Sequence, residues 1–262
     1  MFSRSVVLSF LAVGLAVSSP DVAAVTLDWD VPTNTWTNAN NGSPIPNSYD
    51  VDGVAGNDLT ITISGQVSKL RTEPVSGTQT PAVMSTLQGG MGGEKSLHIY
   101  ANVGTKSEIT VSVSFSATYV QGVENVSFTL FDIDKTTDSE FIRNIYGIAL
   151  DGTLIPATFS NLGSAVALTG SGLTSLLTGI AASPDGSSNG NVTISFGTNV
   201  IKGFAFTFDN SQGPPRTQEF GLHDISFTPV PEINPALSAV GSCLMAISLV
   251  FHHRSRVRSR RK

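Results

Sequence analysis

The acidic residues have the clearest capacity for chemistry in this chain. Four of them fall within nine residues: Asp132, Asp134, Asp138 and Glu140. Asp132 and Asp134 share the parity of the apolar residues before them, so an unbroken strand would carry both carboxylates to the core side at the sheet rim. Carboxylates clustered in a loop suit Ca²⁺, which accepts six to eight oxygens in flexible geometry. The four predict a structural calcium site, or alternatively turns and backbone amides capped by aspartates.

A second acidic group combines residues near the start of the chain with residues of a later segment. It comprises Asp28, Asp30, Asp50, Asp52 and Asp58. The N-terminal strand of a sandwich often lies beside a later loop, so these carboxylates are a second candidate for structural calcium.

Aromatic side chains could contact a sugar. Trp29 and Trp36 are the only tryptophans, and Trp36 lies in a polar segment between Thr33 and Asn38. A ring face packs against the C–H face of a pyranose while nearby Asn and Asp accept its hydroxyls. Trp36 is therefore the predicted carbohydrate contact, and an aromatic plug at one end of the fold is the alternative. Further candidate contacts are Tyr49, Tyr100 and Tyr146.

Patterns typical of enzymes are scarce. His98 and His223 are the only histidines between residues 25 and 229, and neither belongs to an H-E-x-x-H motif. His223 and Asp224 could act together only if their side chains met, and neighbours on a regular strand point to opposite faces. We expect no catalytic activity. The enzymatic alternative is a polysaccharide lyase or glycoside hydrolase, the latter needing two carboxylates facing each other across a cleft.

Alternating residues predict the elements that would position these groups. Apolar residues at every second position from Ile109 to Tyr119 alternate with serines and threonines, which is typical of a half-buried strand. Shorter pieces of the same kind recur at 59–63, 126–130, 192–196, 204–208 and 225–227. The sequence predicts an all-β fold, a jelly-roll-like sandwich of two antiparallel sheets, with an up-and-down barrel as the weaker alternative.

Composition limits the partners and the sources of stability. Residues 25–229 hold 18 acidic and eight basic residues, a formal charge of −10 (8 − 18), and no cysteine. Disulfides and thiolate metal sites are therefore excluded there. Nucleic acid is not an expected partner, because phosphate contacts need stripes of Lys and Arg. A length of 205 residues fits one β domain, or less readily two small ones.

Residues 1–24 have the parts of a secretory signal peptide. Arg4 precedes an apolar run from Val6 to Val17, and small residues end at Ala24. The run is shorter than the ~20 residues of a spanning helix, which favours cleavage near Ala24 over a retained anchor.

The other end predicts a membrane span. Residues 236–251 form an apolar run that reaches ~24 Å as a helix, so flanking residues must help to complete a ~30 Å span. The basic tail holds Arg254, Arg256, Arg258, Arg260, Arg261 and Lys262. By the positive-inside rule this tail would stay in the cytoplasm, which leaves the rest of the chain outside.

The C-terminal segment 230–262 resembles the PEP-CTERM sorting signal. The resemblance lies in Val230, Pro231 and Glu232, the apolar run and the arginine cluster, while the fourth motif position holds Ile233 instead of proline. It implies a Gram-negative cell-surface or matrix protein that an exosortase-type membrane enzyme processes near Glu232, in bacteria that make extracellular polysaccharide. An ordinary single-pass tail anchor is the alternative. Residues 126–134 and 221–230 are also similar to the exported domains that precede such tails.

These features together predict an organisation and a function. We expect a signal peptide at 1–24, an exported β-sandwich at 25–229 and a sorting signal at 230–262. The expected function is that of a cell-surface or extracellular-matrix protein without catalytic activity, whose partners are the membrane and an exosortase-type enzyme. A carbohydrate-binding module for extracellular polysaccharide is the alternative.

Overall fold

The alternation of apolar and hydroxyl residues builds the strands of this protein. The computed structural model describes residues 22–37, 43–103, 108–209 and 216–232. In β6 (Ile109–Phe115), Ile109, Val111 and Val113 are buried and the intervening residues are half-buried or exposed. The hydroxyls pair between strands on the outer faces, as between Thr129 and Thr193 at 3.0 Å. β6 and the strands that share its alternation therefore have one face toward the core and one toward solvent.

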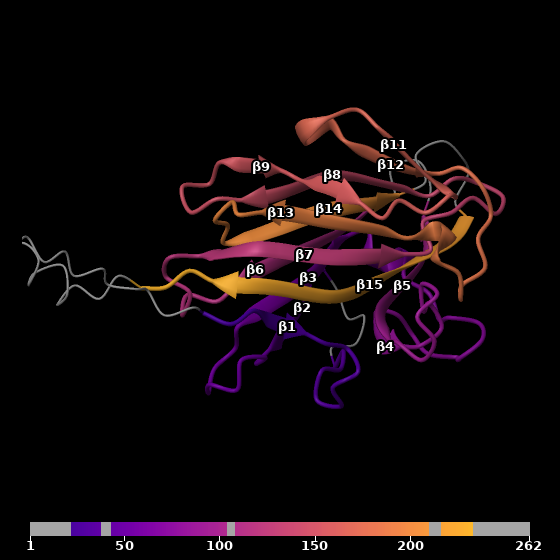
Figure 1. Ribbon diagram of the computed structural model, residues 1–262. Coiled ribbons are helices and arrows are strands. Elements are labelled where there is room, and N and C mark those ends of the chain that lie inside the picture. The colour runs from indigo at the N-terminus through magenta and orange to yellow at the C-terminus, as the bar shows by residue number, and fades with distance from the viewer. Residues whose placement is uncertain (1–21, 38–42, 104–107, 210–215, 233–262) are drawn as a thin grey trace, which may run out of the picture.

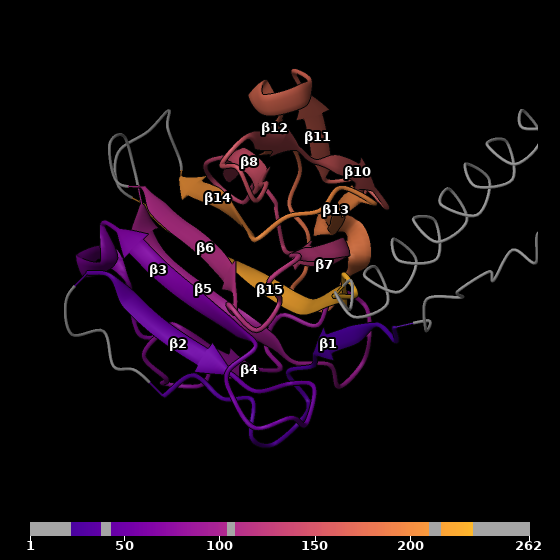
Figure 2. The same cartoon turned by 90° about the vertical axis from the view of Figure 1, so that its left-hand side faces the viewer.

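Two antiparallel sheets face each other in the described part of the chain (Figure 1 and Figure 2). Sheet 1 has the order β10 (Thr158–Ser160), β13 (Val192–Gly197), β7 (Val123–Phe131), β15 (Arg216–Pro229), β5 (Ser96–Val103) and β4 (Ala82–Met84), and β1 (Val25–Leu27) also pairs with β15. Sheet 2 has the order β11 (Val166–Thr169), β12 (Leu176–Gly179), β8 (Phe141–Ile148), β14 (Gly203–Asp209), β6, β3 (Leu59–Gly65) and β2 (Ile45–Tyr49), and β9 (Leu154–Pro156) also pairs with β8. The described helices are three short 3₁₀ turns: η1 (Val67–Lys69), η2 (Gly172–Thr174) and η3 (Ser188–Gly190).

Successive strands repeatedly cross from one sheet to the other. From β5 to β8 the chain alternates between sheet 1 and sheet 2, and it does so again from β12 to β15. The core that the two sheets enclose is aliphatic and aromatic. At its centre Phe128 of β7 stacks on Phe204 of β14, with ring centroids 4.5 Å apart and planes 11° apart. The predicted all-β sandwich of two antiparallel sheets is confirmed, and the barrel alternative is wrong, because the strands form two separate sheets.

The first and last strands lie side by side. Val25 of β1 pairs with Phe227 of β15 in antiparallel register. β15 pairs with β7 along one edge, and with β5 and then β1 along the other. Both ends of the described domain therefore leave the sandwich at the same end, at the left of Figure 1.

A loop covers part of the outer face of sheet 1. Residues 85–95, between β4 and β5, fold over this face, and Leu87 is fully buried there. The sequence indicates a long loop from Gly77 to Gly93, and the structure places the short strand β4 inside it. The loop gives sheet 1 a small second core beneath it, separate from the core between the sheets.

The two predicted end signals lie largely outside the described residues. Residues 1–21 of the signal peptide, the apolar run 236–251 and the arginine tail are all outside the described part of the chain. At the end of the described chain, the Val230 N–H donates to the Gly122 carbonyl at 3.0 Å, while Pro231 and Glu232 are exposed. Within the described residues, no helix has both the length and the apolar composition to cross a membrane.

Candidate functional site

The strand that leads into the predicted calcium site ends before it. β7 stops at Phe131, and Asp132 adopts a left-handed backbone conformation with φ of +64°. Aspartate tolerates this conformation better than most residues. The turn breaks the alternation, so Ile133 enters the core and is fully buried. The expectation of one unbroken strand carrying Asp132 and Asp134 on the same face is therefore wrong.

The structure does not gather the four predicted ligands into one set. Asp134 Oδ2 accepts a hydrogen bond from the Ser183 N–H at 2.7 Å. The two oxygens of Glu140 accept from the N–H groups of Glu219 (3.0 Å) and Asp134 (3.1 Å). Asp138 lies apart, where its Oδ2 accepts from Arg216 Nε at 3.1 Å. Asp134 and Glu140 thus anchor neighbouring backbone, and Asp138 belongs to a surface ion pair.

Asp132 instead meets two acids from distant parts of the sequence, Asp185 and Glu219. One carboxylate oxygen from each of the three lies within 4.8 Å of the others, and we call this group the acidic centre. Asp185 comes from the loop between β12 and β13, and Glu219 from β15. Asp132 is 6% exposed, and its Oδ1 has no hydrogen-bond partner among the described residues. Asp185 is exposed, so the acidic centre opens to solvent on that side.

Negative charge dominates this region. Burial, together with the smaller effects of the carboxylates of Asp134, Glu219 and Asp185, raises the pKa of Asp132 to about 8. Burial also raises the pKa of Glu140, with Asp132 adding to the effect. In the described part of the chain, no lysine or arginine forms an ion pair with the acidic centre. Among the described residues, the one basic side chain in contact with the acidic centre is His98.

His98 is the nearest base, and both of its nitrogens are engaged. Its Nε2 lies 2.6 Å from Glu219 Oε2, and its Nδ1 lies 3.1 Å from Met84 Sδ. The ring is fully buried on β5, and His98 pairs with Ala82 of the neighbouring strand β4. His98 therefore holds Glu219 in place and presents no nitrogen lone pair to solvent.

His223 and Asp224 differ from the expectation for neighbours on a regular strand. Between Leu222 and Ile225, β15 carries one more residue than β7 does between Leu130 and Phe128. Such a bulge disrupts the strict alternation of a strand. The expectation that the side chains of His223 and Asp224 point apart is therefore wrong.

The bulge brings a second cluster together. His223 Nε2 lies 3.3 Å from Glu94 Oε2 and 3.8 Å from Asp224 Oδ2. The Trp29 N–H donates to Asp224 Oδ1 at 3.0 Å. The His223 ring packs against Phe131, with centroids 4.7 Å apart. These contacts fasten the loop 85–95 and the N-terminal segment to β15.

The second acidic group is only partly assembled. Asp50, Asp52 and Asp58 lie together, but Asp58 Oδ2 accepts from the N–H groups of Val51 (2.7 Å) and Asp52 (3.0 Å). Its Oδ1 accepts from the Tyr119 hydroxyl at 2.8 Å. Both oxygens of Asp58 are therefore engaged, Oδ2 by the loop after β2 and Oδ1 by Tyr119.

Asp28 and Asp30 lie elsewhere. Asp28 Oδ1 accepts from the Asp30 N–H at 2.7 Å, and Asp30 Oδ1 lies 3.9 Å from Lys95 Nζ. The structure therefore does not join the N-terminal acids to the group after β2.

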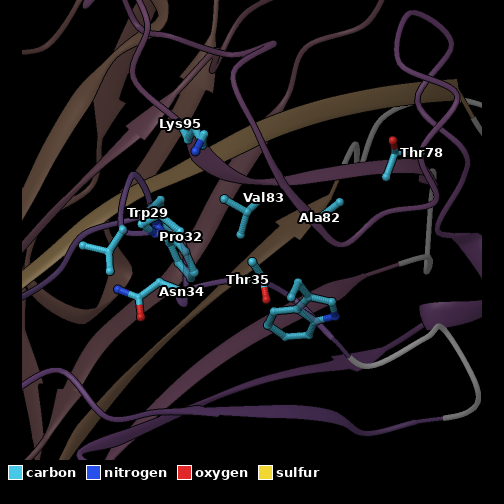
Figure 3. Close-up of a pocket in the computed structure, with 10 residues that line it drawn as sticks. Trp29, Pro32, Asn34, Thr35, Thr78, Ala82, Val83 and Lys95 are labelled. Carbon is cyan, nitrogen blue, oxygen red and sulfur yellow. The ribbon is translucent and has the colours of Figure 1, made fainter.

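Trp36 is half-buried and lines a hollow of about 260 Å³, and Figure 3 labels most of the other residues that line it. Trp29, Asn34, Thr35 and Lys95 are among the residues that line it. The volume lies below the ~300–1,000 Å³ of most small-molecule pockets. The Asn34 amide donates to the Asp28 carbonyl at 2.8 Å, so part of its capacity is already used. This Trp36 hollow has room for a small part of a ligand.

The tyrosines do not extend the Trp36 hollow. Tyr49 is buried, with its ring edge-on to Trp29 at 5.4 Å. Tyr100 on β5 and Tyr146 on β8 belong to opposite sheets, and neither lines the hollow. Trp36 is thus the one predicted sugar contact that the described hollow contains.

Comparison with protein-family models, with curated proteins and with solved structures gives no match. Within the described residues, ligand chemistry is concentrated in the acidic centre and the Trp36 hollow. Sequence reasoning nominated Asp132 and Trp36 but missed Asp185 and Glu219. Asp185 lies in a Gly- and Ser-rich segment, and Glu219 lies on a strand 87 positions beyond Asp132. Only the pairing of β15 with β7 brings Glu219 beside the turn at Asp132.

Proposed function

We propose that this chain is an exported, non-catalytic β-sandwich protein of the cell surface or extracellular matrix. In this proposal residues 1–24 direct export, and residues 230–262 anchor or sort the protein. The main support for this proposal is that the β-sandwich begins and ends where the sequence predicts the borders of the exported domain. β1 begins at Val25, next to the expected cleavage point, and β15 ends at Pro229, next to the Val230-Pro231-Glu232 motif.

The positions of the ends support a single point of attachment. Val25 pairs with Phe227, so the signal peptide and the sorting signal would be joined to the same end of the sandwich. The acidic centre follows the other end of β7, because Val123 pairs with Pro229 and Phe131 pairs with Gly221. Nine strand residues span ~30 Å. A membrane tether at residue 232 would therefore hold the acidic centre away from the bilayer.

The strand orders support a jelly-roll description. The eight strands β5, β6, β7, β8, β12, β13, β14 and β15 alternate between the sheets except at the step from β8 to β12, which are neighbours in sheet 2. In sheet 1 they run β5-β15-β7-β13, and in sheet 2 they run β6-β14-β8-β12. This is the connectivity of two interlocked Greek keys, as in capsid and lectin jelly rolls. The fold is used for many purposes, so it supports a display role without specifying a ligand.

The assignment of no catalytic activity is supported by the state of the acid and base groups. The nitrogens of His98 are engaged by Glu219 and Met84. Each acid of the acidic centre brings one oxygen within 4.8 Å of the others, an arrangement that suits a single ion more than a sugar ring placed between two carboxyl groups. These observations favour a binding or structural role over a lyase or hydrolase.

Protease accessibility in intact cells tests the proposal. The full-length chain would be expressed in a Gram-negative host with an exosortase-type enzyme and in one without it. We expect added protease to digest the domain in both hosts. A shorter product, cut near Glu232, should appear only in the host that has the exosortase-type enzyme. A matched variant with the five arginines of the tail changed to glutamine should be released or misoriented. Retention of the domain in the cytoplasm would refute the proposal.

A carbohydrate-binding module is the second candidate, and the half-buried Trp36 ring in its hollow favours it. A polysaccharide pull-down comparing the wild type with Trp36→Ala and with Tyr146→Ala tests it. We expect binding that falls with Trp36→Ala and persists with Tyr146→Ala, which lies on the other sheet. Absence of binding, or an equal loss in both variants, would count against a sugar site in the hollow.

A further inference from the structure

We propose that Asp132, Asp185 and Glu219 bind a divalent cation, and that Ca²⁺ is the ion whose chemistry fits them best. The three carboxylates come from the turn after β7, the loop between β12 and β13, and β15. One oxygen from each lies within 4.8 Å of the others. A cation at their centre would join three segments that are distant in sequence.

Asp132 also has a buried carboxylate oxygen that lacks a partner in the described part of the chain. Asp132 is 94% buried (6% exposed), and its Oδ1 is inaccessible to solvent and has no hydrogen-bond partner among the described residues. A buried carboxylate oxygen without a partner loses its hydration and gains nothing in return. The other two members of the acidic centre are also acids. An ionised carboxylate accepts hydrogen bonds but donates none, so neither of them supplies a partner for this oxygen. A bound cation supplies the missing interaction.

The acids around the acidic centre hold the segments that carry its ligands. The Glu140 carboxylate accepts the backbone N–H of Glu219 itself. Asp134 Oδ2 accepts the N–H of Ser183, two residues before Asp185. Partners of this kind orient the groups that touch a metal. Asp134 and Glu140 are therefore positioning residues, and the direct ligands differ from the four acids that the sequence indicates.

The chemistry of the acidic centre selects among cations. Its ligand atoms are all carboxylate oxygens, and the nearby His98 has both nitrogens occupied. Hard oxygen ligands suit Ca²⁺ and Mg²⁺ and disfavour Zn²⁺ and Cu²⁺. Ca²⁺ accepts six to eight oxygens in flexible geometry, whereas Mg²⁺ requires a near-ideal octahedron. Water at the exposed side, beside Asp185, can complete the coordination of Ca²⁺.

The test measures calcium binding by the full-length chain, purified in mild detergent and freed of metal with EGTA. Titration with CaCl₂ would be followed by calorimetry and by the melting temperature, with MgCl₂ in parallel. Asp132→Asn and Asp185→Asn each replace a charged carboxylate with a neutral amide, which is a weaker ligand for Ca²⁺. Asp138→Asn is the matched control, because this acid lies nearby in sequence but pairs with Arg216. Asp185 is exposed, so its variant should fold even if Asp132→Asn does not.

We expect saturable Ca²⁺ binding that raises the melting temperature of the wild type. Asp132→Asn and Asp185→Asn should each weaken it by at least ~10-fold, since loss of even an outer partner of a metal site weakens affinity ~10–100-fold. Asp138→Asn should bind like the wild type. The proposal is overturned if the wild type shows no saturable binding, or if Asp138→Asn weakens it as much as Asp185→Asn does. A Mg²⁺ response equal to that of Ca²⁺ would overturn the assignment to calcium.

Discussion

Gly89 packs directly against the ring of Phe131, so closely that a Cβ at Gly89 would overlap the ring carbons. Gly89 also has a positive φ of +54°. Phe131 also contacts His223, whose ring centroid is 4.7 Å away. The glycine therefore lets the loop 85–95 lie flat on sheet 1 beside the strand that leads to Asp132.

Substitution of this glycine should loosen the loop. Gly89→Ala should lower the free energy of unfolding by about 1–3 kcal/mol, because it introduces both a steric overlap and a strained backbone. Gly92→Ala is the control in the same loop, since a Cβ there meets no atom within 4 Å. Urea denaturation would compare the two. Equal stability of the two variants would show that the contact with Phe131 does not determine how the loop packs.

The stacked pair between the sheets should contribute a large part of the stability. Phe204 is fully buried and lies 4.5 Å from Phe128. Phe204→Ala should reduce the free energy of unfolding by about 3–5 kcal/mol, through lost transfer energy and a cavity. Phe159 is partly buried on the edge strand β10, so Phe159→Ala should have a smaller effect. Chemical denaturation of both variants tests this order, which a larger loss for Phe159→Ala would contradict.

Asp58 should act as a structural residue without any metal. Its carboxylate accepts from Val51 N–H, Asp52 N–H and the Tyr119 hydroxyl. Asp58→Ala should lower the free energy of unfolding by about 1–3 kcal/mol, because it leaves these donors unpaired. Asp50→Ala, an exposed neighbour, should change it by less than about 0.5 kcal/mol. Melting temperatures measured with EGTA and with Ca²⁺ should show the same difference between the variants; a difference that appears only with Ca²⁺ would indicate a metal ligand.

Glu73 should make stability depend on acidic pH. Burial alone would raise the pKa of Glu73, but hydrogen bonds from the N–H groups of Ser76 and Val75 together lower it below its usual value of 4.5. A carboxyl group whose pKa is lower in the folded than in the unfolded state stabilises the fold above the unfolded pKa. This contribution should be complete above pH ~4.5 and disappear as the pH falls through the folded pKa.

The variant Glu73→Gln isolates this contribution. Its stability should be lower than that of the wild type at pH 6, and the difference should shrink as the pH falls from about 5 to 3. Denaturant titrations at several pH values measure the difference. A gap that stays constant over this range would mean that the charge of Glu73 does not contribute.

The sequence predicted those parts of the fold that depend on alternation alone. The alternation at 126–130 and 204–208 predicts strands that the structure contains, although both faces of the second are buried. The strand expected from Ile109 to Tyr119 ends at Phe115, because residues 116–119 turn away from the sheet. Strand β5 was not predicted. Its polar residues Ser96 and His98 are fully buried, Ser96 against Leu87 of the loop 85–95 and His98 against Met84, so the contrast between apolar and polar positions is weak.

The acidic centre depends on features that a single sequence does not encode in its local pattern. The left-handed conformation of Asp132 ends the parity on which the four-acid prediction relied. The bulge at His223 and Asp224 reverses the expected direction of a side chain. Glu219 reaches Asp132 only through the register of β15 against β7. The local sequence pattern therefore identified Asp132, whereas Asp185 and Glu219 come close to it only through the tertiary structure.

The position of β15 decides how the sandwich would carry mechanical load. This 14-residue strand leads out of the domain at Pro229 and is hydrogen-bonded to β7, β5 and β1. Tension applied at Glu232 would run parallel to the strand, so these ladders would be sheared together instead of being unzipped one bond at a time. A body held by this end would resist drag from flowing water with its most extensively paired strand.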